Sequence, residues 1–574
     1  MLNSIDKIGD WNPQLLRELK GRLKPFPVII AFVTSLATQL VIFLYQLREI
    51  PDLQSKKNIN ILDKYCNLSD LTKDRYSSWI NCPPNQVNMQ LWWQDHWKYM
   101  FVSLSMIFIF TLLVAGAYLI INDLSQEERK GTLNFIRLSP QSETSIFAGK
   151  MLGVPVLIYL VVLAAIPFHI LTGINANFPF GNILYFYLIL VASCIFFYSF
   201  ALLFGVFGGS TLSGFKPWLG SGFVFVVLFF SAQLFSNNNS DLVNFMGFAA
   251  LISPTTIADY LFPGFLNSQS PALQELKFFN FAVGKSFIGV IALHLSNYAL
   301  WTYWAWQGLK RCFRNSNATI FSKQQSYLIF TCFQIVLIGL FVSIDYNSSE
   351  YRSYWRQFSE AMFVSFLWNM CLMVPLFALM LTHRQSIQDW ARFRFHKEGH
   401  RTDSFKKSLL SELIGGEKSP AVLAIAINLI IAASAVIILF FKANIDSFYS
   451  AENFSKLLGT LLVFVSLTMI YATVAQIMLM LKNSKRVLWA AGTTSALIVL
   501  PILVLGVLNI QPENTLFLFT VGFWFAAEKS TFLTIFAAFA CQVVILGLLN
   551  WYLIKQVRLA GESATKAMFS QAKV

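Results

Sequence analysis

The chain has 574 residues, of which 56% are hydrophobic, 16% aromatic and 13% charged. A soluble domain carries roughly a quarter charged residues. Here the apolar residues fall in blocks of twenty or more, which excludes an ordinary soluble protein. The net charge of +14 would suggest nucleic-acid binding only if basic and aromatic residues shared one soluble surface. The basic residues lie instead between the apolar blocks, so the composition predicts an all-α polytopic membrane protein.

The apolar blocks predict twelve transmembrane helices, because each is long enough to cross about 30 Å of hydrocarbon. They lie near residues 25–47, 99–121, 151–172, 182–208, 218–235, 282–308, 324–344, 357–382, 419–441, 456–481, 487–509 and 530–554. An even number of spans places both termini on one side. Of the 43 basic residues, 29 lie in the termini and loops of that side. The positive-inside rule therefore predicts that both termini are cytoplasmic.

Residues 12–24 precede the first span and predict an amphipathic helix at the membrane interface. Asn12 suits the N-cap and Pro13 the first helical position. The apolar face comprises Trp11, Leu15, Leu19 and Leu23. The basic face comprises Arg17, Lys20 and Arg22. Such a helix is either a simple anchor or a lever that moves with a cytoplasmic partner, and its charges also argue against a cleaved signal peptide.

The longest predicted external loop, residues 48–96, holds Cys66 and Cys82. The other five of the seven cysteines lie in or beside spans, where a small apolar residue is the simpler interpretation. The topology places the loop in an oxidising compartment, where the two thiols are either free or joined. We predict that they form a disulfide.

The cytoplasmic segment NDLSQEERKGTLNFIRLSPQSETSIFAGKMLG, residues 122–153, predicts two short helices at the membrane surface. Ser125 and Glu128 have the spacing of a capping box. Gly131 can end that helix and Thr132 can begin the next. The apolar side of the second helix would comprise Leu133, Phe135 and Ile136. Apolar residues that a solvated loop does not need suggest docking to a partner.

The string E-R-K-G-T-L, followed after five residues by Ser139 and Pro140 and then by a helix containing Gly-Lys, resembles the coupling region of ABC-2 type permeases. The six-span plan, the amphipathic N-terminal helix and the short segment SPTTIADYLFPGF (253–265) before the sixth span resemble the same family. The resemblance covers residues 1–312. The phrase WNPQLLRELKGRLK resembles cyanobacterial members most, which implies a bacterial inner (plasma) membrane or a thylakoid membrane.

The rest of the chain repeats this plan. Residues 25–312 and 313–555 each have two spans, a cytoplasmic segment (123–150 or 384–418) and four more spans, and residues 556–574 form a cytoplasmic tail. An even number of spans per half predicts parallel repeats, with chance similarity as the alternative. The second half keeps Ser419 and Pro420 in GGEKSP but lacks the E-R-K-G-T-L string, so we expect it to couple more weakly.

The resemblance implies the membrane half of an ATP-driven exporter, with ATPase subunits docked on the cytoplasmic segments. ATP and Mg would bind to those separate chains, because the nearest Walker A match, Gly284-Lys285-Ser286, has Phe279 where the first glycine belongs. The implied docking residues of the first half are Glu127, Glu128, Arg129, Gly131, Thr132, Leu133, Phe135, Ile136, Ser139 and Pro140. Those of the second half are Glu412, Gly415, Gly416, Glu417, Ser419 and Pro420. The sequence predicts no catalytic, cofactor or metal site.

Few ionisable groups lie inside the spans. His294, Glu360 and Asn369 are candidates for lining a polar path, because such groups are costly to bury in lipid. Interhelical hydrogen bonding is the alternative for each. The scarcity favours an externally powered exporter of an apolar or amphipathic cargo over a proton-coupled transporter, with one chain or a homodimer forming the path.

Two other function classes remain. An integral membrane enzyme acting on lipid would need carboxylates, or His and Asp, gathered at one membrane face, and the acidic residues are mostly in loops and coupling segments. A membrane scaffold would need no transport path.

Overall fold

The computed structural model describes residues 8–54, 58–67, 79–211, 216–236, 246–266, 272–315, 318–343, 351–397, 404–443, 451–483 and 485–562. In these ranges ten helical stretches are long and apolar enough to cross a membrane. They contain α3 (Pro25–Arg48), α4–η3–α5 (Met89–Arg129), α8 (Val156–Asn175), α9 (Phe180–Thr211), α15 (Lys323–Phe341), α16 (Tyr351–Met380), α19 (Val422–Ala443), α20 (Ala451–Leu479), α21 (Arg486–Val507) and α23 (Phe532–Gly561). The chain is therefore an all-α polytopic membrane protein.

The other two predicted spans are also helical but are not among the ten. They are α10 (Trp218–Ser236), whose apolar stretch Trp218–Leu234 is shorter, and α14 (Phe287–Arg314). The predicted third span begins too early. Residues 151–153 belong to a separate helix, α7 (Glu143–Gly153), and α8 starts only after Pro155. Proline lacks the N–H that would continue the helix, so the chain turns there.

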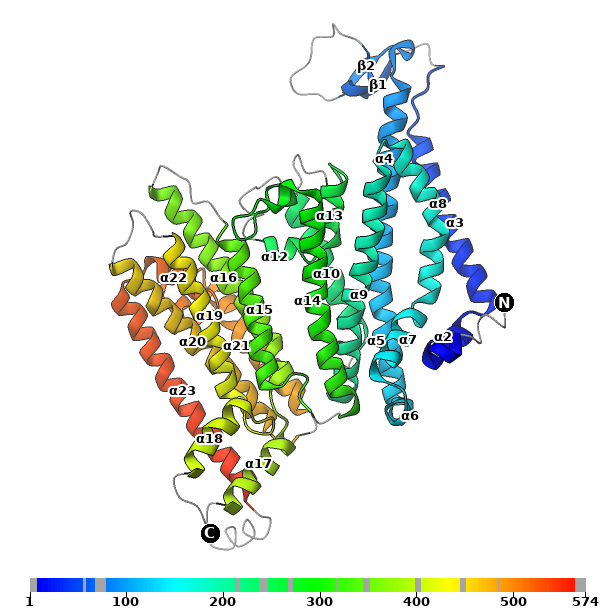
Figure 1. The fold of residues 1–574 in the computed structure, drawn as a ribbon. Helices are drawn as coiled ribbons and strands as arrows, with labels where there is room; N and C mark the ends of the chain where they lie inside the picture. Colours follow the sequence, from blue (N-terminus) through cyan, green and yellow to red (C-terminus); the bar gives the residue numbers. More distant parts are fainter. Residues whose placement is uncertain are drawn as a thin grey trace.

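The stretch from Met89 to Arg129 is one continuous helix of 41 residues. At 1.5 Å per residue it is about 60 Å long, roughly twice the thickness of the hydrocarbon layer. It carries the β-strands at one end and α6 (Thr132–Leu138) at the other (Figure 1). Because it is so long, it joins structures on the two sides of the apolar layer.

A π-helical turn, η3 (Thr111–Ala115), interrupts this long helix near its middle. The turn leaves a carbonyl that needs a partner, and the Tyr198 hydroxyl of α9 donates to the Leu112 oxygen at 2.7 Å. The Tyr198 ring also lies against Gly116, where a Cβ atom would collide with it. Helix α9 thus supplies the hydrogen-bond donor that the irregular backbone of η3 needs within the apolar layer.

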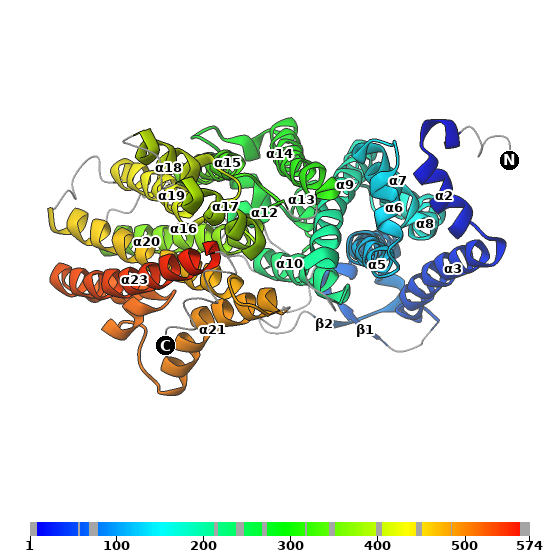
Figure 2. The same ribbon diagram turned by 90° about the horizontal axis from the view of Figure 1, so that it is seen from below.

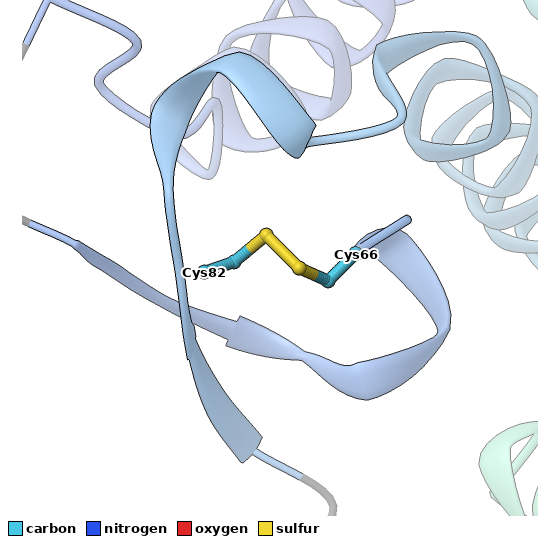
Figure 3. Close-up of a disulfide and its surroundings, with 2 residues drawn as sticks. All are labelled: Cys66 and Cys82. Carbon is cyan, nitrogen blue, oxygen red and sulfur yellow. A yellow bond between two sulfur atoms is a disulfide. The ribbon is translucent and has the colours of Figure 1, made fainter. Parts of the chain in front are cut away.

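The loop that we predict to be external forms a small subdomain. It consists of the antiparallel strands β1 (Ile59–Leu62) and β2 (Trp79–Cys82) and the short 3-10 helices η1 (Asp63–Tyr65) and η2 (Pro84–Gln86). Cys66 and Cys82 form a disulfide (Figure 3). Its small core contains Ile61, Tyr65, Cys82 and Trp92. The last of these belongs to α4, so the subdomain rests on the N-terminal end of the long helix.

The main interior is built by pairs of packed helices. In the first part of the chain α3 packs on α8, and α9 packs on α5 and α14. Further along, α15 packs on α19, and α20 packs on α21 and α23. Figure 2 shows α2 to α9 on one side and α16 to α23 on the other, with α10, α12, α13 and α14 between them.

Several short elements do not cross. α12 (Gly247–Ala250) and α13 (Pro254–Leu261) pack on α10, while η6 (Thr515–Phe519) and α22 (Phe523–Lys529) pack together beside α20 and α23. The 3-10 helices η4 (Ala272–Glu275) and η5 (Val283–Lys285) precede α14. α2 (Pro13–Arg22), α6, α7, α17 (Arg384–Lys397) and α18 (Ser404–Gly415) lie at the end of the molecule opposite the strands (Figure 1).

We predict that replacing both Cys66 and Cys82 by serine opens the hairpin of β1 and β2. The disulfide closes a loop with a sequence separation of 16, which stabilises such a loop by roughly 3 kcal/mol in the chain-entropy model. Hydrogen–deuterium exchange should show faster exchange of the β1 and β2 amides and unchanged exchange in α9. The variant Cys541→Ser, at an exposed free cysteine, is the control. Unchanged protection of the strands in the double variant would contradict the prediction.

Candidate functional site

Helix α2 lies against α7 because α7 presents two glycines to it, one turn apart. A Cβ atom at Gly149 would lie 2.8 Å from the Leu15 backbone nitrogen, and one at Gly153 would lie 2.5 Å from the Cβ of Glu18. Both distances are shorter than side-chain contacts allow. Glycine at these two positions therefore lets the two helices approach so closely.

Asn12 fixes the start of α2, as predicted for an N-cap. Its Oδ1 accepts a hydrogen bond from the Leu15 N–H at 3.0 Å, and its Nδ2 donates to the Ser145 carbonyl of α7 at 2.8 Å. The predicted apolar face is only partly correct. Leu15 is buried against α7, but Trp11 and Leu23 are exposed, which leaves them free to contact the bilayer.

The side chain of Lys150, on α7, is fully buried among three carboxylates. Its Nζ lies 2.6 Å from Asp123 Oδ2, 2.7 Å from Glu127 Oε2 and 3.7 Å from Glu18 Oε1. A buried ammonium needs opposite charges or hydrogen-bond acceptors in place of the water that it loses. These contacts tie α7 to α5, through Asp123 and Glu127, and to α2, through Glu18.

Two arginines of α2 complete this group. Arg17 pairs with Glu127, and Arg22 lies 2.6 Å from Asp123 Oδ1 and 3.2 Å from Glu18 Oε2. Burial disfavours the charged Arg17 side chain, but the charges of Glu127 and Glu18 outweigh this effect and raise the pKa of Arg17. We call the six residues the ion cluster: Arg17, Glu18, Arg22, Asp123, Glu127 and Lys150. Its three positive charges balance its three negative charges.

The carboxylates of Glu18, Asp123 and Glu127 approach each other closely enough to hold a divalent cation, with one oxygen of each within 4.8 Å of the others. The Lys150 ammonium and the two arginines already neutralise them. The same pairing leaves none of the three as a free general base of the kind that a lipid-modifying enzyme would need. The arrangement therefore fits a structural joint better than a metal or catalytic centre.

The predicted capping box at Ser125 and Glu128 is wrong. Both residues lie inside α5, which continues from the membrane span to Arg129. The charged residues at 127–129 consequently form the last turn of α5. In that turn Glu127 belongs to the ion cluster, Glu128 lies 3.3 Å from Arg137, and Arg129 is exposed.

Gly131 ends this helix and Thr132 begins α6, as predicted. Gly131 has a φ of 72°, the left-handed conformation that glycine adopts readily. The Thr132 hydroxyl donates to the Glu127 carbonyl at 3.2 Å, and the Ser139 hydroxyl donates to the Ile136 carbonyl at 2.7 Å where α6 ends. The exposed Pro140 follows. α6 is thus a short helix held at both ends.

The apolar residues of α6 point in two directions, which corrects the predicted single apolar side. Leu133 and Ile136 are buried and hold α6 against the rest of the molecule. Phe135 is 78% exposed and Leu138 is 85% exposed. The outward apolar surface therefore consists of Phe135 and Leu138, and the three-residue spacing of this pair could have been found in the sequence.

In the second segment that we predict to be cytoplasmic, Glu412 joins α18 to α17. Its Oε2 accepts hydrogen bonds from Trp390 Nε1 at 2.9 Å and from Arg394 Nη1 at 2.8 Å. Gly415 is half-buried at the end of α18, and the Gly416 N–H donates to the Glu412 carbonyl at 2.7 Å.

Lys323 stabilises the chain that follows α18. Its Nζ donates to the Leu413 carbonyl at 2.7 Å, to Ser419 Oγ at 2.6 Å and to the Pro420 carbonyl at 3.1 Å. The Ser419 hydroxyl in turn donates to the Glu412 carbonyl at 2.6 Å. Carbonyls at the end of a helix have no partner within the helix, and these bonds supply one. The predicted residues Glu412, Ser419 and Pro420 are thus engaged inside the protein.

The C-terminal end of α14 contacts both of these segments. Arg311 Nη1 lies 2.7 Å from Glu417 Oε1, and this hydrogen bond lowers the pKa of Glu417. Arg314 Nε lies 2.6 Å from Glu143 Oε1 at the start of α7. Neighbouring arginines of one helix therefore link the predicted second-half residue Glu417 to the first cytoplasmic segment.

The three candidate path residues lie on two helices, α14 and α16. Asn369 is buried and bonded, since its Oδ1 accepts from Gln334 Nε2 at 2.7 Å and its Nδ2 donates to the Ser365 carbonyl at 2.8 Å. Asn369 therefore fits the alternative of interhelical hydrogen bonding. Glu360 is half-buried. His294 is fully buried, and neither of its ring nitrogens has a hydrogen-bond partner among the described residues.

Sequence reasoning did not single out His169 of α8. It is fully buried, with Ser105 Oγ 2.8 Å from Nε2 and the Tyr187 hydroxyl 2.7 Å from Nδ1. Sequence reasoning also missed the ion cluster. Asp123 and Glu127 are four residues apart on one helix, and the glycines flank Lys150, but nothing in the sequence says that these two patterns meet.

Comparison of the chain with protein-family models, with curated proteins and with solved structures finds no match.

We predict that Lys150→Met destabilises the protein by about 3 to 5 kcal/mol, because the substitution leaves buried carboxylates without their ammonium partner. Pulse proteolysis in detergent should report the loss. Lys130→Met is the matched control, since Lys130 is exposed and forms no ion pair within the described part of the chain. Equal stability of the two variants would show that the cluster does not hold α2, α5 and α7 together.

Proposed function

We propose that the chain is the membrane-spanning permease subunit of an ATP-driven exporter of the ABC-2 type, and that separate ATPase subunits dock on its cytoplasmic helices. The observation that carries the proposal is the outward surface of α6. Phe135 and Leu138 are largely exposed on a helix that lies beyond the end of α5 (Figure 1). Two large apolar side chains in water favour a partner that covers them.

The contacts that hold α6 in place are suited to transmit a movement of α6 to the helices that it contacts. Gly131 separates α6 from α5, while Leu133 and Ile136 keep it packed. The ion cluster then fixes α5 to α2 and α7. A partner that moves α6 would therefore move a braced group of helices, and α5 continues as the 41-residue helix that reaches the external subdomain. A solvated loop would not transmit such a movement.

Twelve helices in two parallel halves are the layout that we propose. In support, α3 packs on α8 as α15 packs on α19, and α9 packs on α14 as α20 packs on α23. Short helices also precede the last long helix of each half: α12 and α13 before α14, and η6 and α22 before α23. With the basic loops cytoplasmic, both termini and the helices α2, α6, α7, α17 and α18 face the ATPase.

The two docking sites are unequal in this proposal. The second segment offers the exposed Leu410 and the partly exposed Ile414, but Glu412, Ser419 and Pro420 are occupied by internal bonds. We therefore assign the stronger docking to α6. The cargo that we propose is apolar or amphipathic, since Gln334 and Asn369 satisfy each other rather than line a charged path.

We predict that Phe135→Ala weakens ATPase association by roughly 1 to 3 kcal/mol, because buried aromatic anchors carry most of the affinity of an interface. Lys130→Ala, at the rim, should cost much less. The measurement is quantitative co-purification of the ATPase from mild detergent, and Phe135→Asp should abolish it. Leu410→Asp, the corresponding change on α18, should reduce recovery less.

Two outcomes would contradict the proposal. Full recovery of the ATPase with a folded Phe135→Asp variant would remove α6 as the docking site. No ATPase with the wild-type chain, in membranes that contain the native complex, would remove the transporter function itself and favour the lipid-enzyme or scaffold alternatives.

We predict that His294→Leu leaves assembly intact and changes transport modestly. Interhelical polar groups contribute only about 0.6 to 2 kcal/mol in membranes, and His294 makes no described hydrogen bond that the substitution would break. Transport by reconstituted vesicles, alongside Asn369→Leu as a variant that does break a bond, tests this. Complete loss of transport in a folded His294→Leu variant would instead identify a cargo or proton site.

A further inference from the structure

We propose that a groove on α21 binds an anionic phospholipid, with the acyl chain along the groove and the phosphate on the basic residues at its end. The groove has a volume of about 470 Å³ and is lined by Lys485, Leu488, Trp489, Gly492, Thr493 and Ala496. Its assignment to the cytoplasmic leaflet rests on the proposed topology, but lipid binding itself does not.

The dimensions of the groove match one leaflet. It runs from residue 485 to residue 496, which is roughly 16 Å along a helix, about half of the 30 Å hydrocarbon layer. The surface inside it is almost entirely apolar. It is open because the space beside Gly492 is empty within 4 Å and α21 is buried along only a small part of its length. A single chain of a lipid can lie in such a space.

The charge at one end of the groove specifies the headgroup. Lys485 lines the groove, and Lys482 and Arg486 lie beside it in sequence. None of these three cations forms an ion pair with a residue that the structure describes, whereas Arg17, Arg311 and Arg394 all do. Basic residues next to the end of a span attract anionic lipids. Exposed Trp489, one turn further, suits the depth of the headgroups.

A second copy of the chain fits this groove less well. A twofold contact through the same surface would place the basic residues of one copy near those of the other. The like charges would repel each other without an acidic partner. An anionic lipid would fill the apolar groove with its acyl chain, and its phosphate would pair with the cations that have no ion-pair partner among the described residues.

Native mass spectrometry of the full chain in detergent, titrated with phosphatidylglycerol or phosphatidylcholine, tests the proposal. We expect tighter retention of phosphatidylglycerol. Lys485→Gln combined with Arg486→Gln should weaken it about fivefold per lost cation. Gly492→Leu should weaken it similarly by filling the groove while leaving the charges in place.

Two variants are matched controls. Lys418→Gln removes an exposed cytoplasmic cation that forms no ion pair within the described ranges. Gly547→Leu fills space at an exposed glycine of α23 that, like Gly492, has nothing within 4 Å. Both should retain phosphatidylglycerol as the wild type does.

Three results would overturn the proposal: equal retention of the two lipids by the wild type, equal effects of Gly492→Leu and Gly547→Leu, or loss of a dimer in Gly492→Leu, which would make a second copy the occupant. None of these measurements involves the ATPase. Failure of the lipid site is therefore distinguishable from failure of the proposed transport function, which co-purification reports.

Discussion

The structure at the end of the molecule opposite the strands depends on the burial of one positive charge. Lys150 has no contact with solvent, so its ammonium needs partners in place of water, and three carboxylates supply them. Those carboxylates come from α2 and α5 and are themselves close together, so they require Arg17 and Arg22 in turn. Removing Lys150 leaves the three carboxylates without the one cation that contacts all of them. The cluster therefore specifies one arrangement of three helices, and α6 takes its position from that arrangement.

The glycines of α7 make this arrangement possible. Gly149 and Gly153 bring α2 close enough for Glu18 to reach the Lys150 ammonium. The two faces of α2 then have different surroundings. Leu15 and Glu18 face the protein, while Trp11 and Leu23 remain exposed. The helix is thus also one side of the joint that positions α6.

The second half meets a similar requirement by different means. Lys323 is also buried, but its ammonium binds backbone carbonyls and the Ser419 hydroxyl rather than carboxylates. This contact fixes the chain after α18 without joining three helices. Under the proposed function the two halves would respond unequally to ATPase movement, with α14 between them because Arg311 and Arg314 contact both segments.

Much of the fold follows from local sequence. Apolar blocks predict long helices because a bilayer requires about twenty apolar residues per crossing. Asn12 predicts a cap and Gly131 predicts a break because those conformations depend on the residue and its neighbours. The two cysteines of the external loop predict their disulfide for a similar reason, as they share one short segment. Each of these features needs no contact from a distant part of the chain.

Tertiary structure decided the features that distant residues make together. The predicted capping box at Ser125 is absent because α5 continues past this residue to Arg129. A helix that is packed in the interior can continue through a sequence that would locally favour a new helix start. Phe135 and Ile136 look alike in sequence, yet only the position of α6 decides which is buried. The ion cluster joins residues more than one hundred positions apart. A pattern along the chain reports helical faces, but only packing determines which faces meet.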